Sequence, residues 1–496
     1  YDHLDRVVRI IDAEGRKTAF DYDDKGHLAR VTEPDNELRL LSYDAEGRLL
    51  LAKDALGQET AFSYDAAGRL ARRTSPISTS IDYRYDRTGK LTQLINENKE
   101  QYSFTYDPFG RLLEESGFDK KITKYTYTKN TGTLATVTEG DVTTRYEYDV
   151  IGQIIARSGQ GGTERFDYDA NSRLVRASNA VGQNAFSYDV VGNVLAVHQQ
   201  YTLFDTQRDF VWRHTYDEID NRIATRRPDG VETDWLISGS SYVHDMLLNK
   251  ATLASFTRND VYQEKSRTLM NSMQQRSEYD KAGRLQTQAL LEGNFHEKVR
   301  LKREYHYDKI GQLVGVSDST RGDALYRYDP LGRIVRAATP VFDETFSFDP
   351  ASNITTAIAI GTQTTTLPAD VPAVVGNVLR EYAGTHFEYD AQGNMVGKSS
   401  PGCRQECSWN AFHQLVSVRT ARDGASDVVA TYYYDAFGRR IGKQVGKGDG
   451  DAAPVRVIYG WDGENLAFES IVGHECTKHY LYEYESFVPL AQYLSP

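Results

Sequence analysis

The stretch Tyr106-Asp107-Pro108-Phe109-Gly110-Arg111-Leu112 decides the fold, because most of the chain consists of copies of it. Its tyrosine recurs every 21 residues, without an insertion, at positions 1, 22, 43, 64, 85, 106, 127 and 148. An Asp follows in every copy except the one at Tyr127, and most copies continue with Gly, a basic or polar residue, and Leu or Ile. A fixed period of this length is typical of repeat proteins, and the repeating unit is Tyr-Asp-x-x-Gly-Arg-Leu.

Each copy is predicted to form a β-hairpin. Ala61-Phe62-Ser63-Tyr64 alternates apolar and polar residues, which places alternate side chains on opposite faces of a strand. Asp65-Ala66-Ala67-Gly68 predicts a turn, because Asp accepts hydrogen bonds from nearby backbone amides and Gly adopts positive φ at no steric cost. A second strand begins at Arg69. The turn that joins one copy to the next is expected near pairs such as Gly57-Gln58, which joins this copy to the one before it. One hairpin cannot bury its apolar face alone, so the copies must pair edge to edge in a long antiparallel sheet.

The repeated residues are interpreted as structural, because a catalytic residue does not need to occur in so many copies. A tyrosine at the same point of every copy predicts an aromatic ladder along one face, in which each cross-strand contact contributes about 0.2–1 kcal/mol. No catalytic, cofactor-binding or metal-binding residue is predicted. The predicted structural repeat residues are Tyr22, Asp23, Gly26, Tyr43, Asp44, Gly47, Tyr64, Asp65, Gly68, Tyr85, Asp86, Gly89, Tyr106, Asp107, Gly110, Tyr148, Asp149, Gly152, Tyr328, Asp329, Gly332, Tyr434, Asp435 and Gly438.

The composition is that of a folded protein. Of the 496 residues, 40% are apolar and 26% are charged, which disfavours disorder. The net charge of −12 disfavours a nucleic acid partner, because phosphate binding requires a clustered basic surface. Three cysteines, Cys403, Cys407 and Cys476, are too few for a disulfide framework. No signal peptide is evident, and no apolar run reaches the roughly 18 residues that predict a membrane-spanning helix.

The repeats divide the chain into consecutive parts of one domain. We expect strict repeats over 1–230, divergent hairpins over 231–275, repeats again over 276–445 and a closing segment over 455–496. The period shortens by one residue at Tyr168 and Tyr188, while Thr355 to Val375 and Lys443 to Pro454 are expected to leave the sheet. Because the sequence begins inside a repeat, we expect it to be a fragment of a longer protein, without that protein's flanking domains.

Two architectures fit the period. Two copies match the 40–45 residues of a propeller blade, but about twelve blades would exceed the usual 4–8. A continuous ribbon of roughly 23 hairpins would be on the order of 200 Å long. Since sheet twist forbids so long a flat strip, the ribbon is predicted to coil and enclose space.

Together, several motifs resemble the Rhs/YD-repeat proteins of bacterial polymorphic toxins. They are the Tyr-Asp-x-x-Gly-Arg-Leu period, the hairpin from Ser238 to His244, Arg258-Asn259-Asp260, Trp461-Asp462-Gly463 and Phe487-Val488-Pro489-Leu490-Ala491. The resemblance covers essentially the whole chain. It implies an all-β, hollow β-cocoon in which YD-repeat hairpins form a long spiralling antiparallel sheet around a C-terminal toxin domain.

The resemblance also implies a function. The chain would be a non-enzymatic, encapsulating shell, made in the bacterial cytoplasm and delivered to a target cell, with type VI secretion as the expected route. Its implied partners are its own toxin domain as cargo, an N-terminal PAAR or plug region, a secretion spike protein and a chaperone. Two alternatives stay open: the C component of a Tc toxin, and an adhesive module that binds glycans or proteins, as in teneurins.

Two further patterns are interpreted as structural or incidental, not as functional sites. In the family, an Asp-Pro-x-Gly segment self-cleaves to free the toxin; Asp107-Pro108-Phe109-Gly110 and Asp329-Pro330-Leu331-Gly332 share its spelling. Both lie inside ordinary repeat turns, so the cleavage motif and the toxin activity are expected to lie outside this chain. Cys403, Cys407 and His413, like His474, Cys476 and His479, are residue types that zinc accepts, but their spacings match no tight metal motif.

Overall fold

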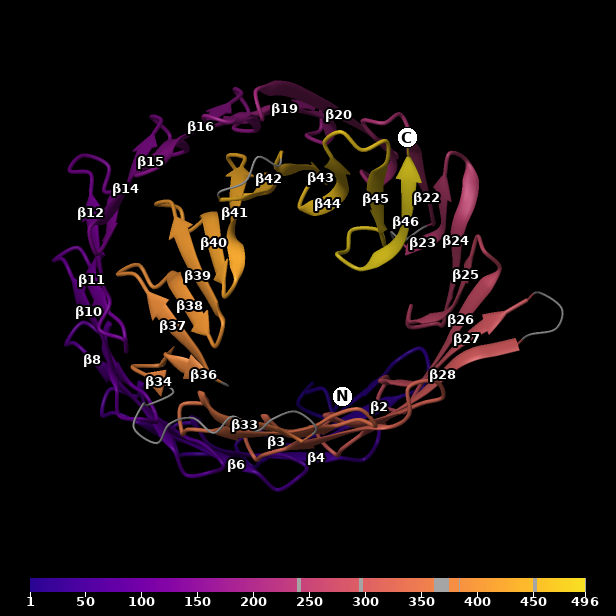
Figure 1. The fold of residues 1–496 in the computed structure, drawn as a ribbon. Coiled ribbons are helices and arrows are strands. Elements are labelled where there is room, and N and C mark those ends of the chain that lie inside the picture. The colour runs from indigo at the N-terminus through magenta and orange to yellow at the C-terminus, as the bar shows by residue number, and fades with distance from the viewer. Residues whose placement is uncertain (239–241, 294–297, 361–373, 383, 449–452, 496) are drawn as a thin grey trace. The chain divides into compact units, whose positions relative to one another are not determined.

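The computed structural model describes residues 1–238, 242–293, 298–360, 374–382, 384–448 and 453–495. Within these ranges the only regular secondary structure is the β-strand. Thirty-three of the described strands form one sheet, two form a small hairpin and eleven form a second large sheet. Strands that follow each other in the chain pair as antiparallel hairpins (Figure 1). The prediction of an all-β fold of long antiparallel sheets is therefore confirmed.

The first half of the large sheet consists of β1 (Arg9–Ile11), β2 (Lys17–Tyr22), β3 (Leu28–Thr32), β4 (Leu38–Tyr43), β5 (Leu49–Lys53), β6 (Glu59–Tyr64), β7 (Leu70–Thr74), β8 (Ser80–Tyr85), β9 (Leu91–Ile95), β10 (Gln101–Tyr106), β11 (Leu112–Ser116), β12 (Ile122–Tyr127), β13 (Leu134–Glu139), β14 (Val142–Tyr148), β15 (Ile154–Gly159), β16 (Gly162–Tyr168) and β17 (Leu174–Ser178). Its second half consists of β18 (Gly182–Tyr188), β19 (Val194–Leu203), β20 (Thr206–Tyr216), β21 (Arg222–Arg226), β22 (Glu232–Ser238), β23 (Tyr242–Leu248), β24 (Ala251–Arg258), β25 (Glu264–Leu269), β26 (Met273–Tyr279), β27 (Leu285–Glu292), β28 (Lys298–Tyr307), β29 (Leu313–Asp318), β30 (Ala324–Tyr328), β31 (Ile334–Ala338), β32 (Asp343–Phe348) and β33 (Ile354–Ile360).

The small hairpin pairs β34 (Val374–Val375) with β35 (Val378–Leu379). The second large sheet consists of β36 (Glu381–Tyr382), β37 (Thr385–Tyr389), β38 (Met395–Ser400), β39 (Cys403–Trp409), β40 (Leu415–Arg422), β41 (Ala425–Tyr434), β42 (Arg440–Lys447), β43 (Val455–Asp462), β44 (Asn465–Ile471), β45 (Thr477–Tyr482) and β46 (Pro489–Ser495).

The hairpin of β6 and β7 shows how one repeat folds. Phe62 pairs with Arg73 and Ser63 with Arg72, but the register then shifts, so that Tyr64 lies opposite Leu70. Such a shift is a β-bulge, and it is possible because Gly68 in the turn has a φ of +78°. The same shift occurs before the last tyrosine of β2, β4, β8, β14 and β30.

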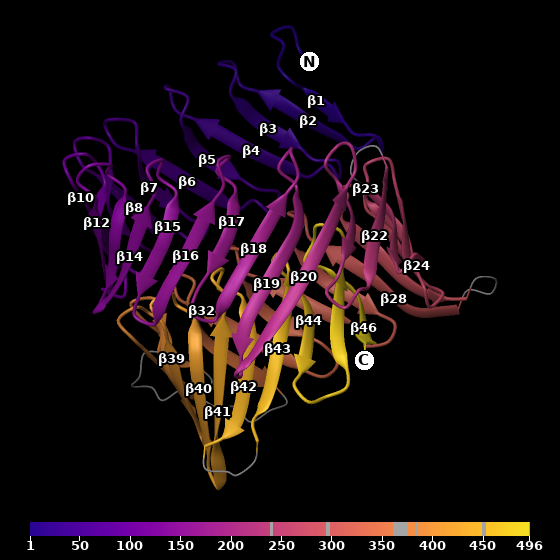
Figure 2. The ribbon, with the colours of Figure 1, turned by 90° about the horizontal axis from the view of Figure 1, so that it is seen from above.

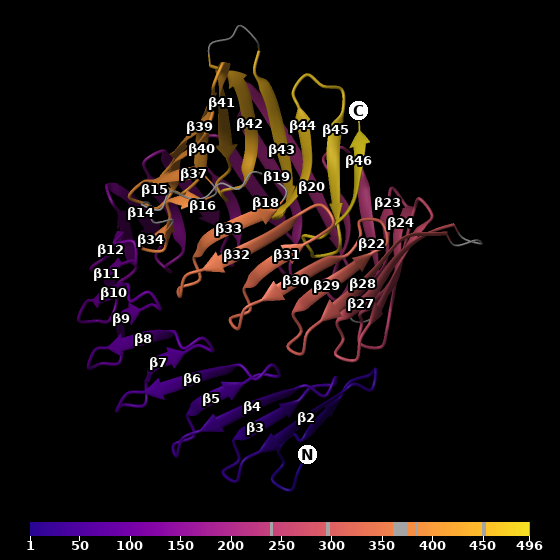
Figure 3. The ribbon, with the colours of Figure 1, turned by 60° about the horizontal axis from the view of Figure 1, so that its bottom comes forward.

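The chain divides into two compact units. Unit 1 contains residues 1–104, 117–119 and 253–383, and Figure 3 shows its two runs of hairpins, β2–β9 and β27–β33. Its buried apolar side chains are Val31, Ala254, Phe256 and Leu291. Most of its strand residues are half-buried or exposed, which is the burial expected of a sheet that is one layer thick.

Unit 2 contains residues 105–116, 120–252 and 384–496. Here the strands β18–β20 lie beside β42–β44, as Figure 2 shows, and the two sheets bury apolar clusters between them. One cluster combines Val197 and Trp212 with Phe468. The other combines Tyr201 and Leu203 with Ile441 and Ile458. Unit 2 therefore has a two-layer core.

The segments expected to diverge from the repeat are only partly described. β22 pairs with β23 around residues 239–241, which lie outside the described residues, as do 361–373 of the expected Thr355 to Val375 excursion. β42 continues to Lys447, so the loop expected from Lys443 begins later than predicted, and residues 449–452 again lie outside the description.

Candidate functional site: the turns that join the repeats

Every predicted repeat tyrosine is the last residue of its strand, and its Asp and Gly lie in the turn that follows. This holds for Tyr22, Tyr43, Tyr64, Tyr85, Tyr106, Tyr148, Tyr328 and Tyr434, which end β2, β4, β6, β8, β10, β14, β30 and β41. We call the Asp-x-x-Gly turn after each repeat tyrosine a YD turn. The turn between one repeat and the next is called a linker turn.

The aspartate closes the YD turn through its carboxylate. Asp65 Oδ1 accepts hydrogen bonds from the backbone amides of Ala67 and Arg69, both at 2.9 Å, and Oδ2 accepts one from Arg69 Nε at 2.7 Å. The Arg69 side chain, followed by the backbone amide of the same residue, holds the pKa of Asp65 below its usual range. An ionised carboxylate with both oxygens engaged is a structural capping group.

The tyrosine and the arginine link each repeat to its neighbours. Tyr64 donates a hydrogen bond from its hydroxyl to the backbone carbonyl of Leu49, in the preceding repeat, at 2.9 Å. The Arg48 guanidinium lies 4.9 Å from the centre of the Tyr64 ring, while Arg69 donates to the carbonyl of Asp86 in the next YD turn. The ring thus contacts a guanidinium of the preceding repeat, where the sequence analysis expected a ladder of tyrosines. Tyrosine hydroxyl bonds to backbone carbonyls recur at Tyr22, Tyr43, Tyr85, Tyr127, Tyr168, Tyr188, Tyr279, Tyr328 and Tyr434.

The two Asp-Pro-x-Gly sequences have the same turn geometry. Asp107 Oδ1 accepts from the amides of Phe109 and Arg111, and Oδ2 accepts from Arg111 Nε at 2.7 Å. Asp329 is held in the same way by Leu331 and Arg333. Burial raises the pKa of each carboxyl, but hydrogen bonds from the backbone and from the following arginine outweigh it, so that the pKa lies below its usual range. Both carboxylates therefore cap turns.

In unit 1, turns from distant parts of the sequence meet through polar contacts. The backbone amide of Asp260 donates to Glu14, and Arg16 donates to Gln263, so the linker turn after β1 contacts the turn after β24, with partners 246 and 247 residues apart. Asn98 and Asp349 form another such pair, at 2.8 Å. We call each set of contacts between linker turns and distant YD turns a seam.

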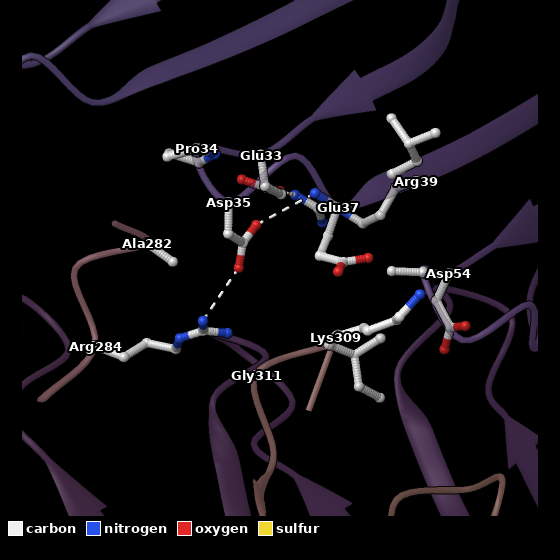
Figure 4. A pocket seen from close by; sticks show the side chains of 13 residues that line it. Glu33, Pro34, Asp35, Glu37, Arg39, Asp54, Ala282, Arg284, Lys309 and Gly311 are labelled. Carbon is white, nitrogen blue, oxygen red and sulfur yellow. Dashed lines mark hydrogen bonds and ion pairs between the residues drawn. The ribbon is translucent and has the colours of Figure 1, made fainter. Parts of the chain in front are cut away.

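A cavity of about 380 Å³ lies along the unit 1 seam (Figure 4). Asp35 points toward Arg284, with an ion-pair distance of 3.1 Å, and Arg39 pairs with Glu33. Acidic and basic side chains thus alternate around the cavity. The pair of Asp35 with Arg284 joins the two rows of turns, whereas Arg39 and Glu33 belong to the same hairpin. Both pairs are partly exposed to solvent, so they stabilise the structure weakly.

In the seam of unit 2, the linker turns and the distant YD turns pack much more closely than in unit 1. The linker turns between β13 and β14 and between β15 and β16 have only two residues, and the second of these lies in the repeat from Tyr148 to Tyr168, where the period is one residue shorter. A methyl group on Gly140 would lie 2.5 Å from Ala391 Cβ, and one on Gly159 would lie 2.7 Å from Ala411 Cβ. Ala411 is also held by a backbone hydrogen bond to Gln160, at 3.0 Å. Glycine turns therefore receive alanine side chains from YD turns.

Asp435 is the one predicted repeat aspartate among the fully buried side chains of the described residues. Arg439 donates to Asp435 Oδ2 at 2.6 Å and to Asn184 Oδ1 at 3.1 Å, across the unit 2 seam. The Tyr201 hydroxyl donates to Asn184 at 2.7 Å, and burial raises the pKa of Tyr201 well above its usual value. The ordinary YD turn is here part of a buried hydrogen-bond network, whose loss would be costly.

A second buried network holds the C-terminal strands β45 and β46. Arg227 donates to the carbonyl of Ala467 at 2.7 Å and to His479 Nδ1 at 3.3 Å. Because a guanidinium can only donate, His479 Nδ1 accepts, and its Nε2 donates to Ser495 Oγ. The His479 ring stacks on Tyr493, whose hydroxyl donates to Asp229. Burial lowers the pKa of His479 to about 4, against the opposing effect of Asp229.

His214 is buried in the same unit. Its Nδ1 lies 2.9 Å from Thr225 Oγ1, and its Nε2 lies 3.9 Å from a carboxylate oxygen of Asp462, in the Trp-Asp-Gly motif. Burial lowers the pKa of His214 to about 4, although Asp462 opposes the shift. The interior of unit 2 thus contains two neutral histidines beside charged groups.

The cysteines and their histidine neighbours take part in separate contacts. Cys403 and Cys407 are half-buried on β39, Cys476 is exposed, and all three are free thiols. His413 contacts Asn394 and Glu139, at 2.8 and 2.9 Å. Over the described ranges no group of three or more His, Cys, Asp or Glu side chains is arranged to hold a metal ion. A search of the same ranges finds no helix suited to crossing a membrane.

The seam residues were missed by reasoning from sequence. Asn184, Arg227 and His214 belong to no repeated motif, and Asp435 looks like every other repeat aspartate. The shortened period at Tyr168 was an available signal, because that repeat contains the tight turn at Gln160-Gly161 in the unit 2 seam.

Comparison with known proteins agrees with this geometry. The family model described as "Teneurin YD-shell" matches residues 1–114, 93–236 and 241–486. The chain therefore belongs to the YD-shell family, and the resemblance to Rhs/YD-repeat shells is confirmed.

Two of the relatives that it matches are named toxins. The chain is 33% identical over 239 residues to the double-stranded DNA deaminase toxin A of Burkholderia cenocepacia (strain H111), an alignment that covers 46% of this chain and 16% of that protein. It is 29% identical over 311 residues to the toxin protein Tse5 of Pseudomonas aeruginosa, covering 56% of this chain and 23% of Tse5. The matched segments thus represent less than a quarter of these relatives' lengths.

Solved structures share the fold. A crystal structure of TcdB2-TccC3 without its hypervariable C-terminal region gives a TM-score of 0.79 at 15% identity, covering 97% of this chain and 29% of that chain. A second structure of TcdB2-TccC3 gives 0.77 at 16% identity, covering 99% and 31%. This chain is accordingly a YD shell of the kind found in toxin-associated proteins.

Proposed function

We propose that this chain is the shell segment of a secreted bacterial Rhs toxin and that it encloses the toxin domain of the same protein until delivery. The shell acts sterically: a sheet wall separates the toxin from the cytoplasm of the cell that makes it. The chain itself contributes no catalytic step, and the toxin activity and the self-cleaving segment lie elsewhere in the protein.

The observation that carries the proposal is the way neighbouring repeats are joined. Many repeat tyrosines donate a hydroxyl hydrogen bond to the preceding repeat, and several turn arginines are bonded to the next. The seams add contacts between repeats that are far apart in sequence. A sheet held along both directions is suited to act as a wall, because no edge is free to open within the joined region.

Delivery is part of the proposal. We infer synthesis in the bacterial cytoplasm and delivery to a target cell by type VI secretion, with an N-terminal PAAR or plug region, a spike protein and a chaperone as partners. The support is the similarity to named toxins. A role as the C component of a Tc toxin rests on the shared fold with TcdB2-TccC3. An adhesive role rests on the teneurin name of the family model.

The test is limited proteolysis with mass spectrometry on the full protein expressed from its native locus. The proposal predicts that a C-terminal fragment co-purifies with the shell, resists protease and is released only when the shell is denatured. A matched sample unfolded in urea before protease treatment shows that the fragment contains cleavable sites. A fragment digested as fast in the native sample as in the unfolded one would contradict enclosure, and binding of the shell alone to cells or glycans would favour the adhesive role.

A further inference from the structure

A small cavity lies within the seam of unit 2. It has a volume of about 140 Å³ and lies between the turn at Gly161-Gly162, which leads into β16, and the strands β40 and β41. A methyl group on Gly162 would meet no atom within 4 Å, so the cavity is open beside this turn. Since a water molecule takes up roughly 30 Å³, a ligand of about four or five non-hydrogen atoms fits the space.

Glu164, on β16, places an unsatisfied acceptor in the wall of this cavity. The side chain is 2% exposed, and its Oε2 accepts a hydrogen bond from Arg157 Nε at 2.7 Å. Its Oε1 accepts no hydrogen bond from any part of the chain that the structure describes. The amide oxygens of Asn179 and Gln414, which also line the cavity, already accept hydrogen bonds. A buried carboxylate oxygen without a donor is costly, so Glu164 Oε1 is the place where a ligand would donate.

The electrostatic surroundings of Glu164 favour a cation over a neutral donor. Burial raises the pKa of Glu164 above its usual range; Arg157 opposes this effect, and the carboxylate of Asp435 adds to it. The ion pair with Arg157 thus compensates the buried charge only in part. A ligand that brought a positive charge to Oε1 would stabilise the ionised carboxylate.

Aromatic rings form much of the remaining wall. The residues that supply them are Phe412, Tyr432, Tyr433 and Tyr434. One of these rings already accepts a cation, because the Arg157 guanidinium lies 4.4 Å from the centre of the Phe412 ring. Aromatic rings attract organic ammonium groups through their π-faces and also pack against the carbon chain that carries the charge. A carboxylate surrounded by rings therefore suits a small organic cation better than a hydrated metal ion.

We propose that this cavity binds a small primary alkylammonium ion, whose N–H groups donate to Glu164 Oε1 while its carbon chain lies against the aromatic wall. The volume suits a chain of about three carbons. A free amine and the end of a lysine side chain share this chemistry. The site lies within unit 2 and does not depend on whether the shell encloses a toxin.

The experiment is ligand-observed NMR on the full protein, with propylammonium chloride as the probe. Saturation transfer from the protein to the probe is followed as the probe concentration is raised at constant ionic strength. We expect saturable binding that is at least about tenfold tighter than that of 1-propanol, which has the same carbon chain without the charge. Equal binding of the two compounds, or no saturable binding of propylammonium, would overturn the proposal and leave the cavity to water.

Two variants place the probe in the cavity. Glu164→Gln removes the charge and should weaken propylammonium binding at least about tenfold, whereas Glu147→Gln, at an exposed position on β14, should leave it unchanged. Because Glu164→Gln also weakens the contact with Arg157, Tyr432→Leu serves as a variant that keeps this ion pair and should weaken binding as well. Tryptophan fluorescence checks that unit 2 of each variant is folded. Unchanged binding in both cavity variants would put the probe elsewhere and overturn the proposal.

A second probe distinguishes the two sources of the ammonium group. Nα-acetyl-lysine amide carries the same group at the end of a side chain whose backbone must stay outside the cavity. Binding of propylammonium alone would support a site for free amines. Binding of both probes, each weakened by Glu164→Gln, would support a site that also accepts lysine side chains.

Discussion

Unit 1 and unit 2 are built from the same repeat but are stabilised differently. In unit 1, distant turns meet through half-buried polar contacts such as Asp35 with Arg284, and few apolar side chains are buried. In unit 2, the turns interlock through glycine and alanine, and Trp212 and Ile441 are completely buried between two sheets. The comparison shows that the repeat sets the local geometry, whereas residues outside it decide how firmly distant repeats are joined.

The largest effect on stability is expected from a substitution in the core of unit 2. Ile441→Ala should destabilise unit 2 by about 4 kcal/mol, because the side chain is fully buried in a packed cluster. All four tryptophans, Trp212, Trp235, Trp409 and Trp461, lie in unit 2, so tryptophan fluorescence during urea unfolding reports this unit. The control Ile95→Ala, half-buried on β9 of unit 1, should leave the fluorescence transition unchanged. Equal shifts for both variants would contradict the comparison.

Acid should weaken unit 2 selectively. The pKa of both His214 and His479 is lowered to about 4 by burial, so the folded state favours their neutral forms. Their contribution is fully present above the unfolded pKa of about 6.5 and is lost as the pH falls toward 4, which for His214 amounts to about 3 kcal/mol. The urea midpoint from tryptophan fluorescence should fall between pH 7 and pH 4.5.

The histidines are tested directly by substitution. His214→Gln combined with His479→Gln should flatten the pH dependence between pH 7 and pH 4.5, whatever its effect on stability at neutral pH. His386→Gln, at an exposed position of the same unit, should leave the dependence as it is. An unchanged slope in the double variant would show that other groups cause the acid sensitivity.

A smaller effect is expected at the glycine turns. Gly159→Ala adds a methyl group 2.7 Å from Ala411 Cβ without requiring positive φ, so it should cost about 1–3 kcal/mol by forcing the seam apart. Gly315→Ala in unit 1 is the matched control, because its nearest neighbour lies at an ordinary 3.4 Å. Thermal unfolding followed by far-ultraviolet circular dichroism, which reports the strands of both units, should detect the first change and not the second. If Gly159→Ala left the thermal stability unchanged, the seam would be more loosely packed than described.

The smallest effect is expected within a single repeat. Tyr64→Phe removes the hydrogen bond to the Leu49 carbonyl and should cost about 1 kcal/mol. Amide exchange should accelerate in β5 and β6 and stay unchanged in repeats farther away, since the contact joins neighbours only. Tyr83→Phe is the control, because the described residues offer its hydroxyl no such carbonyl. Faster exchange throughout both units would show a wider coupling than the local contacts imply.

The local fold could be predicted from the sequence because its determinants are local. The alternation in Ala61 to Tyr64 and the Asp65-to-Gly68 turn specify a hairpin within about ten residues, and the structure contains that hairpin. The partner of the tyrosine ring could not be predicted, because Arg48 and Tyr64 are brought together by the twist and register of two successive hairpins.

The contacts of the seams could not be predicted either, and the reason is different. Asp435 and Asp65 occupy identical motifs, yet only Asp435 is buried, through contact with Asn184 from 251 residues upstream. No local pattern encodes a contact of that separation, because it depends on the accumulated path of all the hairpins between. The alanines in the YD turns and the shortened period are traces of the seam in the sequence. Only the structure shows which turns they bring into contact.

The most direct test of the comparison is hydrogen exchange with mass spectrometry on the full protein at neutral pH. The account predicts slow exchange in β18–β20 and β42–β44, where two layers bury the clusters around Trp212 and Ile441. It predicts exchange at least about tenfold faster in β2–β9, which form a single layer with little buried apolar surface. Uniform protection from exchange across both units would contradict the account. It would mean that stability comes from the repeat itself and not from the seam.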